Sequence, residues 1–270
     1  MKTIIYSMLT AFLMLMQATF TFAQSDTINR TDQHNLKQGY WKKVYPNGHT
    51  AYEGWFKDNK PIGELKRYRE DGSLKATVIY GQAGTYSRVL FYSTNGGKIA
   101  EGFYLDKQKD SLWQYYNSAS NLIFEEHYTN GTRHGRFKQY YNDGKTYEVV
   151  PYVNGKIEGI LVQFYPNGLN KTTISFANGT QHGSIKVFYP DGKIRIEGNY
   201  DNGLKHGDWK FYSPDGKLTE TVKYIRGIPE NYNQKLDKEN QELEDMLKNI
   251  GKIQEPTVEN FLENMEARSF

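Results

Sequence analysis

The sequence predicts an all-β repeat protein: an elongated single-layer antiparallel sheet of about eight β-hairpins, followed by a C-terminal α-helical segment. The first observation is an internal repeat of 24 residues, which recurs without insertion or deletion from residue 39 to residue 230. Its units begin at Gly39, Gly63, Ser87, Ser111, Gly135, Gly159, Gly183 and Gly207. A repeat of this length decides the architecture, because each copy forms one supersecondary unit.

The second observation is that fixed positions of the unit keep one residue type. The third position is apolar in every unit: Trp41, Leu65, Val89, Trp113, Phe137, Leu161, Ile185 and Trp209. The eighteenth is aromatic in every unit: Phe56, Tyr80, Tyr104, Tyr128, Tyr152, Phe176, Tyr200 and Tyr224. The tenth is Gly in seven of the eight units, and each of these glycines follows Asn or Asp. A second Gly stands at position twenty-one in the last five units. Each unit therefore reads as strand, tight turn, strand, looser turn.

A single hairpin buries too little apolar surface to be stable, so the hairpins must stack along one axis. The sixth position is also aromatic in seven units: Tyr68, Tyr92, Tyr116, Tyr140, Phe164, Phe188 and Tyr212. Positions three and six of a regular strand face opposite sides. Either the strand bends before the turn or both faces carry an aromatic ladder. These seven residues are the candidate binding surface, and Trp41, Trp55, Trp113 and Trp209 are further places to examine.

Composition excludes several classes of protein. The chain has 270 residues, of which 24% are charged and 15% aromatic, and a net charge of +3. That composition is typical of a folded protein, and the near-balanced charge gives no nucleic-acid footprint. The chain has no cysteine, which rules out disulfides, cysteine-ligated metals and attachment as a bacterial lipoprotein.

Residues 1–23 have the pattern of a secretory signal peptide. Lys2 precedes an apolar run that ends in Thr21-Phe22-Ala23, which predicts cleavage between Ala23 and Gln24. A membrane anchor is the alternative, but polar residues interrupt the run. We expect an exported protein, periplasmic or secreted, in which residues 24–38 are a flexible leader.

Residues 231–270 have a different pattern. Leu236, Leu243, Met246, Leu247 and Ile250 form a helical stripe, and a second short helix is expected after Pro256-Thr257, with Val258, Phe261, Leu262 and Met265 on one side. This segment is expected to cap the open end of the sheet, or alternatively to mediate self-association or partner binding.

Three units share a further pattern: an aromatic residue, then Gly-x-x-His-Gly after two residues. It is visible as Tyr128 to Gly135, Phe176 to Gly183 and Tyr200 to Gly207. The pattern resembles the MORN repeat, and the Tyr-Pro-Asn/Asp-Gly turn resembles its variant in bacterial proteins labelled as antitoxin components. The resemblance covers residues 39–230 and implies a β-hairpin scaffold, with an antitoxin-like role as one possibility. The starts of repeats two to four depart from it, since the His-Gly pair is missing there and two of these junctions read Tyr86-Ser87 and Asp110-Ser111.

The sequence offers little catalytic chemistry. His134, His182 and His206 share one column, but neighbouring copies of a column lie about 10 Å apart, too far for a shared metal. The same spacing separates Glu101 from Glu125, which is beyond the ~5 to 5.5 Å of a retaining glycosidase pair and leaves only an inverting pair, at ~6.5 to 9.5 Å, as an alternative. We find no nucleophile elbow, phosphate loop or His-Glu-x-x-His helix. No cofactor, metal or catalytic residue is predicted.

The predicted function is therefore an exported, non-enzymatic scaffold that binds an unidentified protein. The alternatives are an envelope-binding module for glycan or phospholipid, an antitoxin-like component, and a carbohydrate-active enzyme that uses Glu101 and Glu125.

Overall fold

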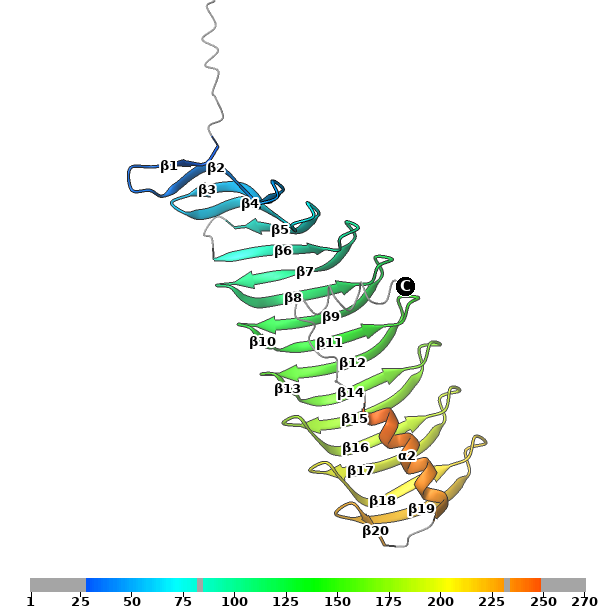
Figure 1. Cartoon of the computed structure of the whole chain (residues 1–270). Helices are drawn as coiled ribbons and strands as arrows, with labels where there is room; N and C mark the ends of the chain where they lie inside the picture. The colour runs from blue at the N-terminus through cyan, green and yellow to red at the C-terminus, as the bar shows by residue number, and fades with distance from the viewer. Residues whose placement is uncertain (1–27, 82–84, 231–233, 249–270) are drawn as a thin grey trace, which may run out of the picture.

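The computed structural model describes residues 28–81, 85–230 and 234–248. Within them the chain forms one long, open, twisted antiparallel sheet in which successive strands lie side by side, and a single helix lies across one of its faces (Figure 1). The expected fold class is confirmed. The expected signal peptide, the first part of the leader and the second short helix lie outside the described residues.

The twenty strands follow one another along the axis of the sheet. They are β1 (Arg30–Thr31), β2 (Lys37–Val44), β3 (Thr50–Lys57), β4 (Lys60–Tyr68), β5 (Leu74–Tyr80), β6 (Tyr86–Tyr92), β7 (Lys98–Leu105), β8 (Gln108–Tyr116), β9 (Leu122–Thr129), β10 (Thr132–Arg133), β11 (Gly135–Tyr140), β12 (Thr146–Val153), β13 (Lys156–Ile157), β14 (Gly159–Phe164), β15 (Asn170–Ala177), β16 (Thr180–Phe188), β17 (Ile194–Asp201), β18 (Leu204–Tyr212), β19 (Leu218–Ile225) and β20 (Ile228–Pro229). The helix is α2 (Gln234–Lys248).

The turn at the tenth-position glycine is the longer of the two in each repeat. In the first unit Tyr45 N–H donates to the His49 carbonyl and Gly48 N–H donates to the Tyr45 carbonyl, so three residues form the loop. Gly48 has a φ of +87°, and the Asn47 side-chain oxygen accepts a hydrogen bond from His49 N–H at 3.0 Å. The Asn or Asp thus closes the turn through its side chain, and only the Gly needs the left-handed conformation.

The turn at position twenty-one is the tight one. Between β17 and β18, Asp201 and Leu204 are paired residues, so Asn202 and Gly203 alone form the loop, with φ values of +50° and +81°. A two-residue loop with both angles positive is the type I′ turn that matches strand twist, and Asn-Gly suits it best. The sequence analysis expected the reverse assignment of tight and looser turns, which is wrong because Asn-Gly occurs in both loops.

One face of the sheet, here the core face, carries the third-position and eighteenth-position side chains. Fully or nearly fully buried on it are Phe56, Leu65, Val89, Trp113, Tyr128, Phe137, Tyr152, Leu161, Ile185, Tyr200, Trp209 and Tyr224. Directly paired residues share a face, as Trp209 does with Val222. The third-position and eighteenth-position side chains therefore form one apolar layer along the sheet.

The opposite face, here the outer face, carries the sixth position together with positions two, four, fifteen and seventeen of each unit. In β18, for example, Trp209 and Phe211 are buried on the core face, whereas Asp208, Lys210 and Tyr212 alternate with them. Of the two explanations offered for the sixth-position aromatics, the second holds: both faces carry an aromatic ladder.

Helix α2 lies on the core face over β15–β19 and not along the terminal edge strand (Figure 1). Leu243 is buried in the same apolar cluster as Trp209 and Tyr224. Polar contacts fix the helix at its rim, because Glu242 pairs with Arg195 at 2.7 Å and the Asn240 side-chain oxygen accepts from Lys205 Nζ at 2.6 Å. The described part of the chain includes no helix with the length and apolar character needed to cross a membrane.

Candidate binding surface on the outer face

The sixth-position side chains, proposed from sequence as a binding surface, all lie on the outer face, where each is partly buried. Several of their hydroxyl groups are engaged across the strand pair. Tyr68 donates to Glu53 and Tyr212 donates to Glu197, each at 2.7 Å. The glutamate is the fifteenth residue of the preceding unit, so the pair joins two neighbouring repeats.

The identity of the sixth residue follows this partner. Where the preceding unit supplies Glu at position fifteen, the sixth residue is Tyr, as in Glu53–Tyr68, Glu101–Tyr116, Glu125–Tyr140 and Glu197–Tyr212. Where it supplies Val149 or Thr173, the sixth residue is Phe164 or Phe188. Tyr92, beside Thr77, is the exception. A hydroxyl is thus present mainly where a carboxylate can accept from it, which assigns these glutamates a structural role.

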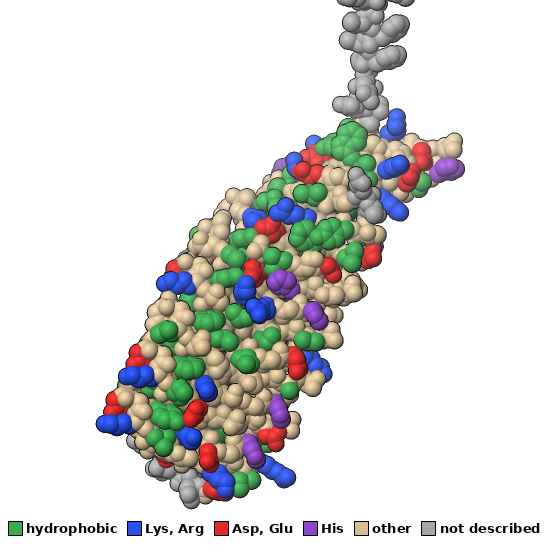
Figure 2. Space-filling model, turned by 180° about the vertical axis from the view of Figure 1, so that it is seen from behind, with side chains coloured by type: hydrophobic (Ala, Val, Ile, Leu, Met, Phe, Trp, Pro, Cys, Tyr) green, Lys and Arg blue, Asp and Glu red, His purple; other side chains and the backbone are tan. Residues whose placement is uncertain are grey.

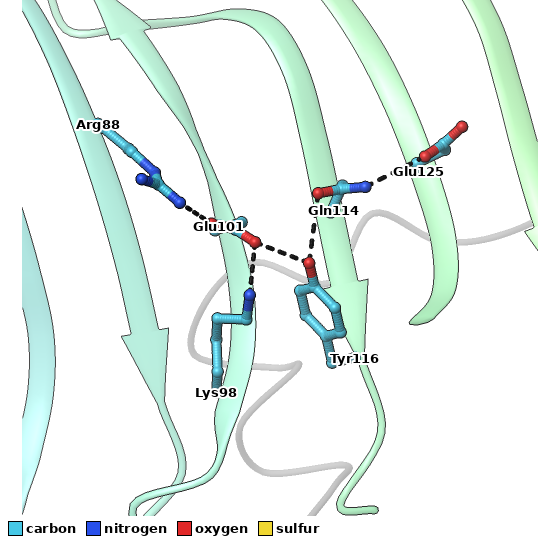
Figure 3. Close-up of polar contacts among 6 residues, drawn as sticks. All are labelled: Arg88, Lys98, Glu101, Gln114, Tyr116 and Glu125. Atoms are coloured by element: carbon cyan, nitrogen blue, oxygen red, sulfur yellow. Dashed lines mark hydrogen bonds and ion pairs between the residues drawn. The ribbon is translucent and has the colours of Figure 1, made fainter. Parts of the chain in front are cut away.

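Glu101 lies at the centre of the densest polar cluster on this face (Figure 3). Arg88 contacts one carboxylate oxygen at 2.6 Å, and the other accepts from Lys98 at 2.5 Å and Tyr116 at 2.7 Å. Burial disfavours the charged form, but hydrogen bonds from Lys98, Arg88 and Tyr116 outweigh it and lower the pKa of this carboxyl to about 2. Glu101 is therefore an anion across the physiological pH range.

Gln114 stands between Glu101 and the next carboxylate of the column, Glu125 (Figure 3). Its amide nitrogen donates to Glu125 at 3.3 Å, and Lys138 Nζ contacts the other Glu125 oxygen at 3.0 Å. Burial again acts to raise the pKa, but hydrogen bonds from Lys138, Tyr140 and Gln114 hold the pKa of this carboxyl below its ordinary value. Two carboxylates that are both ionised lack the proton donor that glycoside cleavage requires.

A row of apolar side chains runs across β2–β7 on the same face, one from each strand. This exposed row consists of Tyr40, Trp55, Ile62, Ile79, Tyr86 and Phe103. Trp55 is 54% exposed, Ile62 43%, Ile79 42% and Tyr86 40%. Figure 2 views the sheet from the side opposite to α2 and shows hydrophobic side chains interspersed with charged ones.

The aromatic rings of the exposed row pack in two pairs. Tyr40 and Trp55 meet edge to face at 5.7 Å between ring centroids, and Tyr86 stacks on Phe103 at 5.3 Å. Trp55 and Ile62 are directly paired residues of β3 and β4. Six strands at about 4.8 Å spacing make the row about 24 Å long. It is an apolar strip in which the charged residues Glu64 and Arg88 flank Ile79 as its paired neighbours.

At the far end of the same face, the equivalent repeat positions are polar, and the exposed apolar residues Leu204, Ile225 and Ile228 lie beside the tight turns instead. Position two, which is Tyr40 in the first unit, is Ser184 and Asp208 in the last two units. Position seventeen, which is Trp55 and Ile79 in the first two units, is Asn199 and Lys223 in the last two. The repeat scaffold is thus the same at both ends, and the outer face differs. The first three units are the part of the sheet that carries Tyr, Trp and Phe at these positions.

Sequence reasoning singled out Trp55 but missed the rest of the exposed row. It examined the columns for residues that all units share, whereas this row arises where columns two, seventeen and twenty-four differ between units. The other tryptophans fall elsewhere: Trp113 and Trp209 are fully buried on the core face, and Trp41 is partly buried and donates from Nε1 to the Arg30 carbonyl at 3.1 Å.

The histidine column lies along one edge of the outer face, where His134, His182 and His206 are exposed. His182 is 3.4 Å from Asp201, and His134 donates its backbone N–H to the His127 carbonyl. Within residues 28–81, 85–230 and 234–248, no three potential metal ligands come together.

Comparison with known proteins supports the repeat assignment in part of the chain. Residues 133–154, 181–202 and 205–225 match the MORN repeat variant. No curated protein matches the chain significantly.

Among solved structures, a point mutant of S. aureus TarM in complex with fondaparinux, a GlcNAc-glycerol and UDP aligns with 11% identity and a TM-score of 0.23, over 44% of this chain and 19% of that one. TarM itself aligns with 12% identity and the same TM-score, over 45% and 19%. These alignments cover less than a fifth of TarM and carry no functional argument, whereas the three matched segments identify MORN-type repeats in this chain.

Proposed function

We propose that this protein is a non-enzymatic repeat scaffold that binds another protein through the outer face of β2–β7. The observation that carries the proposal is the exposed row, in which Trp55 and Tyr86 remain accessible together with Ile62 and Ile79. Tryptophan and tyrosine are the residues most enriched among the strong contact points of protein interfaces. They supply a large rigid area together with a polar group at the tip.

The surroundings of the row suit a protein partner. Glu64 and Lys66 of β4 pair at 3.3 Å, and Lys42 lies 3.9 Å from Glu53 beside the row. An apolar strip bordered by charges of both signs has the organisation of a protein interface, with an apolar centre and a polar rim. The sixth-position ladder lies on the same face, so Tyr68 and Tyr92 could extend the contact toward the turns.

Catalysis by the outer face is disfavoured by its electrostatics. Glu101 and Glu125 are each held as anions by several hydrogen bonds, and each participates in the contacts between repeats. A general acid needs a raised pKa and a free proton. We therefore assign these carboxylates to the scaffold.

Export is part of the proposal and depends on residues 1–23. A positive start followed by a short apolar stretch and a small terminal residue supports cleavage between Ala23 and Gln24. The partner would then be a protein of the envelope or the medium. An antitoxin-like role would require the protein to bind its partner through the same surface before export. The identity of the captured partner therefore distinguishes the antitoxin-like role from the exported scaffold.

Glycan binding is a second candidate function, and the stacked Tyr86–Phe103 pair with the exposed Trp55 favours it. Flat aromatic rings on an open face are also suited to sugar rings. Phospholipid binding has less support, since anionic membranes reward clustered Lys and Arg and the chain has a net charge of only +3.

The test is capture of partners from envelope and medium fractions on the immobilised chain from Gln24. Trp55→Ser with Ile79→Ser removes two members of the exposed row. Asn199→Ser with Lys223→Ser changes the same repeat positions at the polar end and is the matched control. We expect the first pair to reduce retention of the specific partner by roughly tenfold or more and the control pair to leave it unchanged.

Equal retention by both pairs, with unchanged circular dichroism, would refute binding through this row. A parallel pull-down with purified cell-wall polysaccharide distinguishes the second candidate: retention that the first pair abolishes would favour glycan as the ligand.

A further inference from the structure

The core face contains two copies of one side-chain arrangement, exactly four repeats apart in sequence. In the first, Trp113 lies over Gly102, meets Tyr104 edge to face at 5.1 Å, and donates from Nε1 to the Phe103 carbonyl at 3.0 Å. Lys109 Nζ lies 4.8 Å from the Trp113 ring. This group, with Tyr128 as its next neighbour, is called the inner site.

The second copy has the same geometry. Trp209 lies over Gly198, meets Tyr200 at 5.2 Å, and donates to the Asn199 carbonyl at 3.1 Å. Lys205 Nζ lies 4.8 Å from the Trp209 ring. With Tyr224, this group is called the α2 site. The lysine also lies over the following tyrosine in both sites, at 4.9 Å from Tyr128 and 5.3 Å from Tyr224.

Helix α2 occupies the α2 site on the core face. Asn240 accepts from Lys205, and three residues later Leu243 is buried with Trp209 and Tyr224. Met246, one turn further on, packs against the same cluster. The site therefore takes an amphipathic helix that presents an oxygen acceptor to the lysine and an apolar residue to the aromatic rings.

Trp113 is as fully buried as Trp209, yet it lies in β8, well away from the strands that α2 crosses (Figure 1). A single-layer sheet leaves a face open unless something covers it. The inner site thus has the chemistry of a helix-binding site and the burial of a covered one.

The sequence of the C-terminal segment repeats the residue pattern with which α2 contacts the sheet. The run Leu243-Glu-Asp-Met246 returns nineteen residues later as Leu262-Glu-Asn-Met265. In this alignment Glu259 takes the place of Asn240, which offers a carboxylate where α2 offers an amide oxygen. Residues 255–268 contain four glutamates and one arginine, and the inner site offers the ammonium group of Lys109, whereas the nearby Arg133 is paired with the buried Glu126 at 2.6 Å. A carboxylate at position 259 is complementary in charge to Lys109.

The length of chain is also sufficient. Four repeats of two strands at about 4.8 Å separate the two tryptophans by about 38 Å. α2 runs from β19 toward β15 and so leads toward the inner site (Figure 1). From Asn240 to Glu259, with residues 251–256 extended and the rest helical, the chain spans about 40 Å.

We propose that residues 256–268 form a second amphipathic helix that docks on the core face at the inner site, with Glu259 against Lys109 and Leu262 against Trp113 and Tyr128. The C-terminal segment then covers the middle repeats as α2 covers the last ones. This proposal concerns the core face and is independent of partner binding on the outer face.

The test measures the reactivity of lysine amines toward an acylating reagent by mass spectrometry, with Lys205 as the internal control. In the chain from Gln24 to Phe270 both Lys109 and Lys205 should react slowly. In a chain that ends at Ile250, and in the full chain with Leu262→Asp and Met265→Asp, Lys109 should react roughly tenfold faster while Lys205 remains protected. A synthetic peptide of residues 252–270 should restore protection to the shortened chain.

Unchanged Lys109 reactivity in both variants would overturn the proposal. So would protection that depends on protein concentration in the full chain, because that result would identify a second copy of the chain as the occupant. Retained protection of Lys205 shows that the sheet is folded in each variant.

Discussion

The close contact between Gly102 and Trp113 gives the sharpest test of how the repeats pack. A Cβ atom on Gly102 would lie 2.2 Å from Cδ2 and 2.4 Å from Cε2 of the Trp113 ring. Trp113 is 0% exposed, and its Nε1 is held by the Phe103 carbonyl. The substitution Gly102→Ala therefore forces the ring out of its site.

The expected cost combines three effects. Overpacking a tight core costs about 1–3 kcal/mol, and loss of the indole hydrogen bond adds about 1 kcal/mol. Replacing Gly by Ala lowers the entropy of the unfolded chain and returns about 0.4–1 kcal/mol. The net loss is about 2 kcal/mol, which for a chain of this size lowers the melting temperature by about 4–8 °C.

The assay is thermal and urea unfolding of the chain from Gln24, followed by circular dichroism and tryptophan fluorescence. Gly97→Ala is the matched control, since a Cβ there would meet only Ser93 Oγ at 3.4 Å. Trp113→Leu on the Gly102→Ala background should recover part of the lost stability. Gly102 and Trp113 correspond to Val150 and Leu161 two repeats later, where a larger residue at the glycine position faces a smaller one at the tryptophan position. Wild-type stability of Gly102→Ala, or an equal loss in Gly97→Ala, would refute the packing described here.

Three further predictions concern other contacts. Tyr116→Phe should destabilise the chain by about 1–2 kcal/mol in urea unfolding, because it removes a hydrogen bond to the Glu101 carboxylate; Tyr92→Phe, beside Thr77, should cost less, and equal costs would contradict the pairing. The pKa of Glu101 is lowered from 4.5 to about 2, so its stabilisation is complete above pH 4.5 and is lost as the pH falls toward 2; the stability difference between wild type and Glu101→Gln should shrink over that interval, and a constant difference would contradict it. Leu243→Ala should cost about 2–5 kcal/mol and increase hydrogen exchange in α2 and β17–β19 while leaving β3–β7 unchanged; uniform exchange along the sheet would argue against local packing of α2.

The repeat made most of the fold predictable. Its period fixed the hairpins, and the alternation of Trp209 and Phe211 with Lys210 and Tyr212 defined the two faces. The assignment of the two turns failed because Asn-Gly serves in both loops: in one Asn47 closes the turn through its side chain, and in the other Asn202 itself takes a positive φ. Sequence spacing alone does not distinguish these two uses of one dipeptide.

The site was predictable only in part. The sixth-position residues could be named from the sequence, but their pairing with glutamates such as Glu53 depends on the register between neighbouring hairpins. That register also brings Trp55 opposite Ile62 and so creates the exposed row. The position of α2 on the core face depends on its contacts with Arg195 and Lys205, which lie in strands distant in sequence.

Site-specific photo-cross-linking measures most directly whether the outer face of β2–β7 binds a partner. A photoreactive phenylalanine analogue replaces Trp55 in one variant and Asn199, at the equivalent repeat position, in another. After incubation with envelope or medium proteins of the source organism, the Trp55 variant should form a discrete adduct that excess unlabelled wild type suppresses, and the Asn199 variant should form none. Adducts of equal yield at both positions, or at neither while a partner is still captured, would contradict binding through this face.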